Sequence, residues 1–420
     1  MSQHTLTGPS DELWGSRRRH PTARPVVPPK RSRTFAGLVG LIAVLNLLGL
    51  VMVMSASSVS ALDTYGSSWY IAMRQGIWLS LGTVMCVLVM KVDYHRWRRW
   101  SLPALGVSGL LLALVLVPGV GVNVNGSSRW LGYGPLSLQP SELAKLTVLL
   151  FVADLLARRA AWIADLRLTL VPVAVVFGFF AMLLMLQPNL GTTLVLGAIV
   201  LSVLHVAGTP LLPLAGVGFG GGIVATGLAL GASYRRARVL AFLNPWHDPL
   251  NTGYQNIQSL VGIASGGLTG VGLGESRAKW GFLPYAHTDF IFAIIAEELG
   301  LIGAFVVVAL FAALCVLGAK AAQQAPDRFG MLLAAGVTVW FGVQAFVNIG
   351  AVIGILPITG VPLPFLSYGG SSLVFSMIGA GLLLNVARQG QTPSRAVARS
   401  TVRPRRARTG RGRSTTPTAR

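Results

Sequence analysis

The chain has 420 residues, of which 53% are hydrophobic and 11% charged, and its mean hydropathy is +0.65. Soluble globular chains carry about a quarter of their residues as charges, so this composition excludes an ordinary soluble protein. The formal net charge of +21 gathers at the two ends of the chain, in tails (residues 1–34 and 390–420) rich in Pro, Ser, Thr and Gly. We expect these tails to be disordered in the cytoplasm and to contact anionic membrane lipid, and we expect no nucleic-acid partner.

Ten apolar segments between the tails are candidate transmembrane helices, because a spanning helix needs about 20 mostly apolar residues. The sequence therefore predicts an all-α polytopic membrane protein with one transmembrane domain over residues 35–389. The predicted spans are approximately Phe35–Ser55, Tyr70–Met90, Pro103–Val117, Glu142–Leu156, Thr169–Leu186, Gly191–Val206, Leu211–Gly231, Asp289–Gly318, Met331–Ile353 and Ser372–Ala387.

The Lys and Arg residues of the short loops predict the orientation, since cytoplasmic loops carry an excess of basic residues. They gather in Lys91–Trp100, in the loop between the fourth and fifth spans, and in Lys320–Arg328. With these loops inside, both termini are cytoplasmic and the protein lies in the cytoplasmic (inner) membrane. The large loop between the seventh and eighth spans, about residues 232–288, is then extracytoplasmic.

This outer loop is basic, which the orientation does not explain. Long loops cross the membrane largely regardless of charge. Its cations therefore indicate an anionic partner at the outer surface, with lipid headgroups as the alternative. They are Arg235, Arg236, Arg238, Arg277 and Lys279.

Asp289 stands where the eighth span is expected to begin, with no Lys or Arg close in sequence. An aspartate at this position can cap the helix N-terminus, and it can also act in catalysis. His287, two residues earlier, could hydrogen-bond a hydroxyl or a phosphate, or it could be a packed loop histidine.

Further charges lie within predicted spans, where ionisable groups are expensive and face a cavity or a partner. Glu142 and Lys145 have the i,i+3 spacing of an ion pair on one helix face, which is either structural or holds substrate. Glu297 and Glu298 are expected about 12 Å deeper than Asp289.

A Pro- and Gly-rich outer segment, Gly354–Ser372, precedes the last span and cannot be a regular helix. Irregular backbone at the membrane edge is tolerated against protein or a water-filled cavity. We therefore predict a wet, outward-facing cavity lined by this segment and the Asp289 loop.

At these motifs the chain resembles the SEDS family (shape, elongation, division and sporulation), which includes FtsW, RodA and SpoVE. The resemblance covers about Phe35 to Gln389. Ala286–Phe292 looks like the family's His-Thr-Asp-Phe-Ile-Phe motif, and Pro357–Ser372 like its C-terminal signature. A third block contains Arg129-Trp130 and Gln139-Pro140-Ser141-Glu142 with Lys145.

The resemblance implies a ten-span peptidoglycan glycosyltransferase that polymerises lipid II, the undecaprenyl-pyrophosphate-linked disaccharide-pentapeptide, with Asp289 as the catalytic residue. It also implies a class B penicillin-binding protein and other divisome proteins as partners. The Asn244–Gln255 stretch and Ala286-His287 look more like FtsW than RodA, which favours septal synthesis in cell division over an elongation or sporulation role. The residues that we assign to substrate binding are Arg129, Glu142, Lys145, Arg238, Gln258, Ser259, Lys279, His287, Thr288, Ser367, Gly369, Gly370 and Ser371.

One position departs from the family pattern: Asn189 stands where the family block usually reads Gln-Pro-Asp-Leu-Gly-Thr. If that aspartate caps a helix, asparagine replaces it well. If it binds a cation or pairs with a base, the function is altered here.

The expected reaction is attack of a sugar hydroxyl on an anomeric carbon, with Asp289 as general base and the outer-loop cations and Arg129 stabilising the leaving pyrophosphate. A divalent cation, Mg²⁺ or Mn²⁺, could share that task, although the sequence contains no convincing set of metal ligands. The alternatives are a lipid II flippase, for which intramembrane charges would form a polar path, and a scaffold without catalysis, which would leave Asp289 without a purpose.

Overall fold

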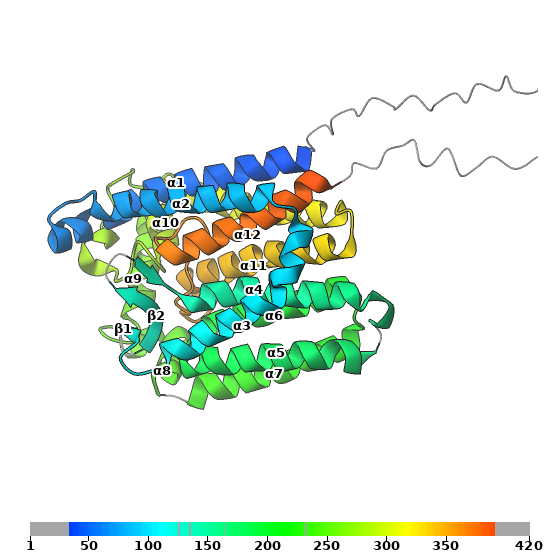
Figure 1. The fold of residues 1–420 in the computed structure, drawn as a ribbon. Helices are drawn as coiled ribbons and strands as arrows, with labels where there is room; N and C mark the ends of the chain where they lie inside the picture. Colours follow the sequence, from blue (N-terminus) through cyan, green and yellow to red (C-terminus); the bar gives the residue numbers. More distant parts are fainter. Residues whose placement is uncertain (1–32, 125–126, 134–135, 164, 232, 391–420) are drawn as a thin grey trace, which may run out of the picture. The chain divides into compact units, whose positions relative to one another are not determined.

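The computed structural model describes residues 33–124, 127–133, 136–163, 165–231 and 233–390. Each predicted span overlaps a long helix, and these helices lie side by side (Figure 1), so the all-α polytopic fold is confirmed. The predicted tails lie outside the described residues except for Arg33, Thr34 and Gly390. The long helices are α1 (Arg33–Tyr65), α2 (Tyr70–Lys91), α3 (Trp97–Val115), α4 (Pro140–Arg158), α5 (Leu166–Leu186), α6 (Leu190–Ala207), α7 (Leu211–Gly231), α10 (Ile291–Gln323), α11 (Arg328–Val352) and α12 (Gly370–Gln389).

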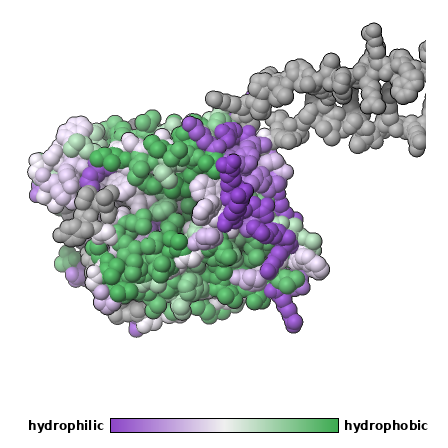
Figure 2. All heavy atoms as spheres, viewed as in Figure 1, coloured by the Kyte–Doolittle hydropathy of each residue, from purple (hydrophilic) through white to green (hydrophobic). Residues whose placement is uncertain are grey.

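Eight of these helices are long and apolar enough to cross a membrane by length and composition. The other two, α3 and α4, have 19 residues each; α3 begins with Arg98 and Arg99 among polar and aromatic residues, and α4 carries four charged residues. Figure 2 shows a broad apolar band over the helices with a polar zone at the end opposite the sheet. Such a band is the surface expected of helices surrounded by lipid.

The helix boundaries differ from those predicted at two spans. Helix α1 continues ten residues beyond Ser55, and its 33 residues extend over about 50 Å, whereas the hydrocarbon core is about 30 Å thick. With the N-terminus inside, its last turns rise above the outer surface. Helix α3 begins at Trp97, so the basic segment Lys91–Trp100 is largely helical, with a short η1 helix (Tyr94–Arg96) before α3.

The core lies around α4, α11 and α12. The sequence did not indicate that these helices are central, because each of them contains several polar residues. Most α12 residues are buried, as are those of α4, whereas α7 exposes nearly all of its length. At the basic end, Asp154 on α4 accepts hydrogen bonds from Arg98 Nε (2.7 Å) and Arg158 Nε (2.9 Å). This shared carboxylate fastens α3 to α4.

Segments outside the helix bundle gather at the opposite end, near the label β1 in Figure 1. A three-stranded antiparallel sheet of order β1-β2-β3, which the sequence did not predict, pairs Val122 with Trp130 and Leu131 with Leu138. The predicted loop 232–288 also contains helices. These elements are β1 (Gly121–Val124), β2 (Ser127–Tyr133), β3 (Leu136–Leu138), α8 (Ser233–Leu243), η3 (Pro245–His247), α9 (Tyr254–Gly266) and η4 (Ala278–Phe282), while η2 (Ala160–Trp162) follows α4.

Helix α10 is broken at Gly300, whose φ of +68° is left-handed. The segment after α9 supplies the hydrogen bonds that the break releases: Leu301 N donates to Gly267 O (2.9 Å), and Val271 N donates to Glu297 O (3.0 Å). A side chain at Gly300 would meet the backbone of Leu268 at 2.4 Å. The outer loop is therefore built into the helix, and it fixes the short outer part of α10 that follows Asp289.

Candidate active site

Asp289 lies in a turn just before α10, and its side chain does not cap that helix. The N-cap residue is Phe290, which has no side-chain cap. The turn is closed by hydrogen bonds from Thr288 N (3.0 Å) and Phe290 N (3.4 Å) to the carbonyl of Tyr285, whose φ is +60°. The capping alternative therefore has no support in the geometry, and the carboxyl group is left for another role.

The Pro- and Gly-rich segment packs over this carboxyl group. Asn348 on α11 donates from Nδ2 to the carbonyls of Asp289 (2.8 Å) and Val361 (2.9 Å), which joins the two segments. A Cβ atom added to Gly360, whose φ is +69°, would lie 3.6 Å from Asp289 Oδ2. Gly191 at the start of α6 lies against the same Pro- and Gly-rich segment, because a Cβ there would meet Thr359 O at 2.9 Å. Small residues thus let backbone approach the carboxyl group.

Two guanidinium groups act on Asp289. Burial raises the pKa of Asp289 to about 6, while the positive charges of Arg238 and Arg129 lower it. Arg129 comes from β2 and donates to the carbonyls of Gln187 (3.0 Å) and Pro188 (2.6 Å). Arg238 comes from α8 and donates to Ile358 O at 3.4 Å. A half-buried carboxylate with a pKa near neutrality, beside two cations, suits proton abstraction close to a phosphate.

His287 and Thr288 lie beside Asp289 but serve the turn. The carbonyl of His287 accepts from Tyr368 N (2.9 Å), and the two rings lie 5.6 Å apart between centroids. Burial lowers the pKa of His287, which keeps its ring neutral at pH 7. Thr288 Oγ1 donates to Tyr285 O at 3.1 Å. Contact of either side chain with substrate remains a prediction.

The predicted pair of Glu142 and Lys145 forms, with Lys145 Nζ 2.8 Å from Glu142 Oε1, and each residue is 1% exposed. Lys145 also donates to Gln344 Oε1 on α11 (2.7 Å), and Ser372 Oγ on α12 donates to Glu142 Oε2 (3.3 Å). The pair thus joins three core helices. Its burial favours the structural alternative over substrate holding.

Glu297 and Glu298 also accept hydrogen bonds from neighbouring segments of the protein. Glu297 accepts from Ser276 Oγ (2.5 Å) and from the backbone N–H of Arg277 (2.9 Å). Glu298 Oε1 accepts from Ser55 Oγ on α1 (2.6 Å). These carboxylates hold the outer loop and α1 against α10, at the break in that helix.

The other predicted binding residues surround the site without converging on Asp289. Ser259 is buried and donates to Val352 O (2.7 Å), while Gln258 next to it is half-buried. Lys279 is buried and bonds to Gly274 O within its own loop. Arg236 and Arg277 are exposed, and the side chain of Arg235 lies outside the described part of the structure.

The predicted binding residues of the C-terminal signature lie at the start of α12 and just before it. Ser367 Oγ accepts from Leu363 N (2.8 Å), and Ser371 Oγ accepts from Gln139 N (3.2 Å). A Cβ on Gly370 would meet the Trp78 ring at 2.5 Å, and Gly369 is the N-cap of α12. These four residues therefore shape the backbone around the site.

Asn189 is the N-cap of α6, and its Oδ1 accepts from Thr192 N at 3.3 Å. This geometry agrees with the capping interpretation of the departure from the family pattern. Its carboxamide adjoins the backbone that Arg129 binds, since Arg129 donates to the carbonyls of Gln187 and Pro188.

The protein side chains around Asp289 do not form a complete site for a divalent cation. Across the described residues, no three His, Cys, Asp or Glu side chains come together as a metal site. The charges that act on Asp289 are guanidinium groups, which repel a cation. Mg²⁺ can also bind through one carboxylate together with substrate phosphates and waters, so a divalent cation that arrives with the substrate stays a prediction.

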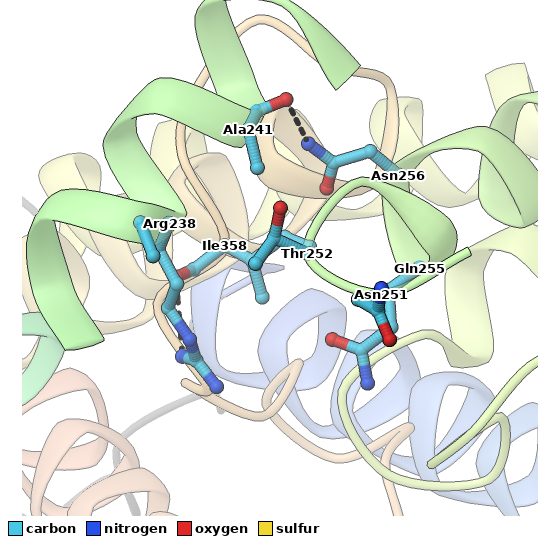
Figure 3. A pocket seen from close by; sticks show the side chains of 8 residues that line it. Arg238, Ala241, Asn251, Thr252, Gln255, Asn256 and Ile358 are labelled. Carbon is cyan, nitrogen blue, oxygen red and sulfur yellow. Dashed lines mark hydrogen bonds between the residues drawn. The ribbon is translucent and has the colours of Figure 1, made fainter. Parts of the chain in front are cut away.

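A pocket of about 180 Å³ borders the site, and sequence reasoning missed it. It shares Arg238 and Ile358 with the surroundings of Asp289 and is otherwise lined by α8, α9 and the turn before α9 (Figure 3). The turn is compact because Gly253 lies against the carbonyl of Pro245. The Asn- and Gln-rich run from Asn251 to Asn256 was the available signal.

Comparison with known proteins gives consistent results. The profile of the FtsW/RodA/SpoVE family, described as "Cell cycle protein", matches residues 36–392. Stage V sporulation protein E of Bacillus subtilis is 43% identical over 352 residues, covering 84% of this chain and 96% of that protein. A "Probable peptidoglycan glycosyltransferase FtsW" of Geobacter metallireducens is 42% identical over 355 residues, covering 83% and 93%.

Two solved structures are similar throughout the transmembrane domain. A chain in "Structural coordination of polymerization and crosslinking by a peptidoglycan synthase complex" has a TM-score of 0.70 and 35% identity, covering 84% of this chain and 97% of that chain. The rod shape determining protein RodA of Thermus thermophilus has a TM-score of 0.64 and 33% identity, covering 85% and 97%.

Proposed function

The chain belongs to the FtsW/RodA/SpoVE family of membrane proteins, and from this premise we propose that it is a peptidoglycan glycosyltransferase that polymerises lipid II at the outer face of the cytoplasmic membrane. The observation that carries the proposal is the half-buried Asp289 carboxyl group, with a pKa of about 6, under the charges of Arg129 and Arg238. Relatives named as probable peptidoglycan glycosyltransferases support the reaction class.

In the proposed reaction, Asp289 accepts the proton of the acceptor sugar's hydroxyl group. The hydroxyl oxygen forms a bond to the anomeric carbon of the donor sugar as the bond from that carbon to the pyrophosphate oxygen breaks. Undecaprenyl pyrophosphate leaves with the bonding electron pair. A hydroxyl group is a poor nucleophile at neutral pH, so a base within hydrogen-bonding reach accelerates the step. Guanidinium groups stabilise the charge that grows on the leaving phosphate.

A lipid II flippase is the competing function, and the buried charges weigh against it. Its polar path would run through Glu142, Lys145, Glu297 and Glu298. Glu142 and Lys145 pair with each other at 1% exposure, while Glu297 and Glu298 accept hydrogen bonds from neighbouring segments. Displacing such pairs for a passing headgroup would leave charges buried and unpaired, which costs several kcal/mol, about 3–5 for each broken pair.

The proposed partner is a class B penicillin-binding protein, with other divisome proteins, and the proposed place is the division septum. A similar chain occurs in a structure described as a peptidoglycan synthase complex, which supports a partnered enzyme. The septal role rests on the FtsW-like motifs of the outer loop. Elongation and sporulation roles are the alternatives, because the identity to SpoVE (43%) equals that to FtsW (42%).

The test incubates the purified full-length protein with fluorescent lipid II, alone and with the penicillin-binding partner, and separates products by gel electrophoresis. Wild type should form glycan chains and Asp289→Ala should form none. Asp63→Asn, which alters an exposed carboxylate at the outer end of α1, is the matched control and should retain activity. Polymer from Asp289→Ala would refute the base assignment, and lipid movement between leaflets without polymer would favour the flippase.

A further inference from the structure

The pocket beside the active site contains amide and hydroxyl side chains that have no role in the proposed reaction. Asn251, Thr252, Gln255 and Asn256 line it together with Arg238 (Figure 3). The charge of Arg238 also acts on Asp289. The Asn and Thr side chains come from the turn before α9 and from α9, and Arg238 comes from α8.

The hydrogen bonds around the pocket leave acceptor atoms facing it. Asn251 Nδ2 donates to Asp248 Oδ1 (3.0 Å), and Thr252 Oγ1 donates to Asp248 Oδ2 (3.0 Å). Asn256 Nδ2 donates to Ala241 O at 3.2 Å. Carboxylate and carbonyl oxygens can only accept, so these contacts fix which amide atom is nitrogen. Each of these carboxamide nitrogens keeps a second N–H, so amide donors remain beside the amide oxygens.

Asn256 Oδ1 is the most constrained of these oxygens. Asn256 is 8% exposed, and its Oδ1 has no hydrogen-bond partner among the described residues. An unpaired buried acceptor costs free energy, which a ligand with an N–H group would recover. The pocket therefore combines one unpaired amide oxygen with the guanidinium group of Arg238.

This pattern selects among the chemical groups of lipid II. Pyrophosphate carries only acceptors, so it cannot donate a hydrogen bond to the unpaired oxygen of Asn256. Sugar hydroxyl groups can donate, yet the disaccharide has no carboxylate for Arg238 away from its peptide attachment. A peptide offers both amide N–H donors and carboxylates, and a carboxylate pairs with guanidinium in a strong charge-assisted geometry.

We propose that this pocket binds the peptide stem of lipid II, with peptide N–H groups on the oxygens of Asn251 and Asn256 and a peptide carboxylate on Arg238. The inference rests on the proposed function, since it takes lipid II as the substrate. It adds that the enzyme reads the peptide as well as the sugars, and that the stem holds the substrate next to Asp289.

The test compares two substrates: lipid II with its full pentapeptide, and lipid II from which the peptide has been removed. The double variant Asn251→Ala/Gln255→Ala alters the pocket and leaves Asp289, Arg129 and Arg238 in place. Initial rates of polymerisation at limiting substrate should fall at least about five-fold on the full substrate, the effect of losing one or two hydrogen bonds. On the peptide-free substrate they should change less than about two-fold. Thr64→Ala, on the exposed outer end of α1, is the control.

Binding of the free pentapeptide to the purified protein is measured in parallel by calorimetry, and it should weaken in the double variant. Equal losses on both substrates would overturn the proposal and assign the pocket to the sugars. Unchanged rates and unchanged peptide binding would also overturn it. If wild type polymerises neither substrate, the proposed function fails, while peptide binding that is lost in the double variant still supports the pocket.

Discussion

The raised pKa of Asp289 predicts an unusual pH dependence for the polymerisation rate. A general base works in its deprotonated form, so activity should be nearly full at about pH 7, half at about pH 6 and lost as the pH falls further. An ordinary aspartate has a pKa of about 3.9 and would stay deprotonated throughout this range. With a pKa near 6, the deprotonated fraction is about 90% at pH 7 and about 10% at pH 5, so the rate should fall roughly ten-fold.

Substitution of Arg129 sharpens this prediction. Its positive charge lowers the pKa of Asp289, so Arg129→Gln should move the midpoint of the pH profile upward, above that of wild type. The assay measures initial rates on fluorescent lipid II between pH 5 and pH 8 at limiting substrate, where the pH profile reports the pKa of the free enzyme, after incubation controls for stability at each pH. Asp63→Asn should leave the midpoint unchanged. A rate that is flat between pH 7 and pH 5, or a midpoint that moves down in Arg129→Gln, would refute the reasoning.

Two further predictions concern residues near the site. Lys145→Met leaves Glu142 charged and unpaired in the core and should cost about 3–5 kcal/mol of stability, whereas Glu142→Leu/Lys145→Met should cost clearly less. Thermal unfolding in detergent measures the stability of both variants. Equal losses of stability would contradict the account of a buried structural pair. Asn189→Asp replaces the N-cap of α6 by another good capping residue and should leave activity within two-fold of wild type. An activity change of ten-fold or more would instead assign that position a part in the reaction.

The helices were predictable because their apolar length depends on local sequence alone. Each of the ten predicted spans overlaps a helix, and even the charged α4 was found, since Glu142 and Lys145 have the spacing of a pair on one helix face. The boundaries were less predictable. Nothing in composition marks where α1 leaves the membrane, because residues 56–62 continue the helix with small and apolar side chains.

The outer elements could not be predicted, because contacts distant in sequence hold them. The sheet is paired across a short irregular segment, and Arg129 on β2 is fixed by carbonyls of residues 187 and 188. The break of α10 at Gly300 depends on the backbone of Gly267 and Leu268, which satisfies it from another segment. A lone glycine in a long apolar run gives no sign of this.

The chemistry of Asp289 depends on the balance between its burial and these distant segments. Burial alone pushes the carboxyl group toward its protonated form, in which it cannot accept a proton, and the two guanidinium charges oppose this shift. Both charges come from elements outside the helix core. Arg238 belongs to α8 and donates a hydrogen bond to Ile358 O, and Arg129 belongs to β2. The helices therefore position Asp289, the proposed base, while the charges of the outer segments oppose the rise in its pKa that burial causes. Because the pocket for the peptide shares Arg238, a carboxylate bound there would partly neutralise that charge and raise the pKa of Asp289, which couples occupancy of the pocket to the strength of the base.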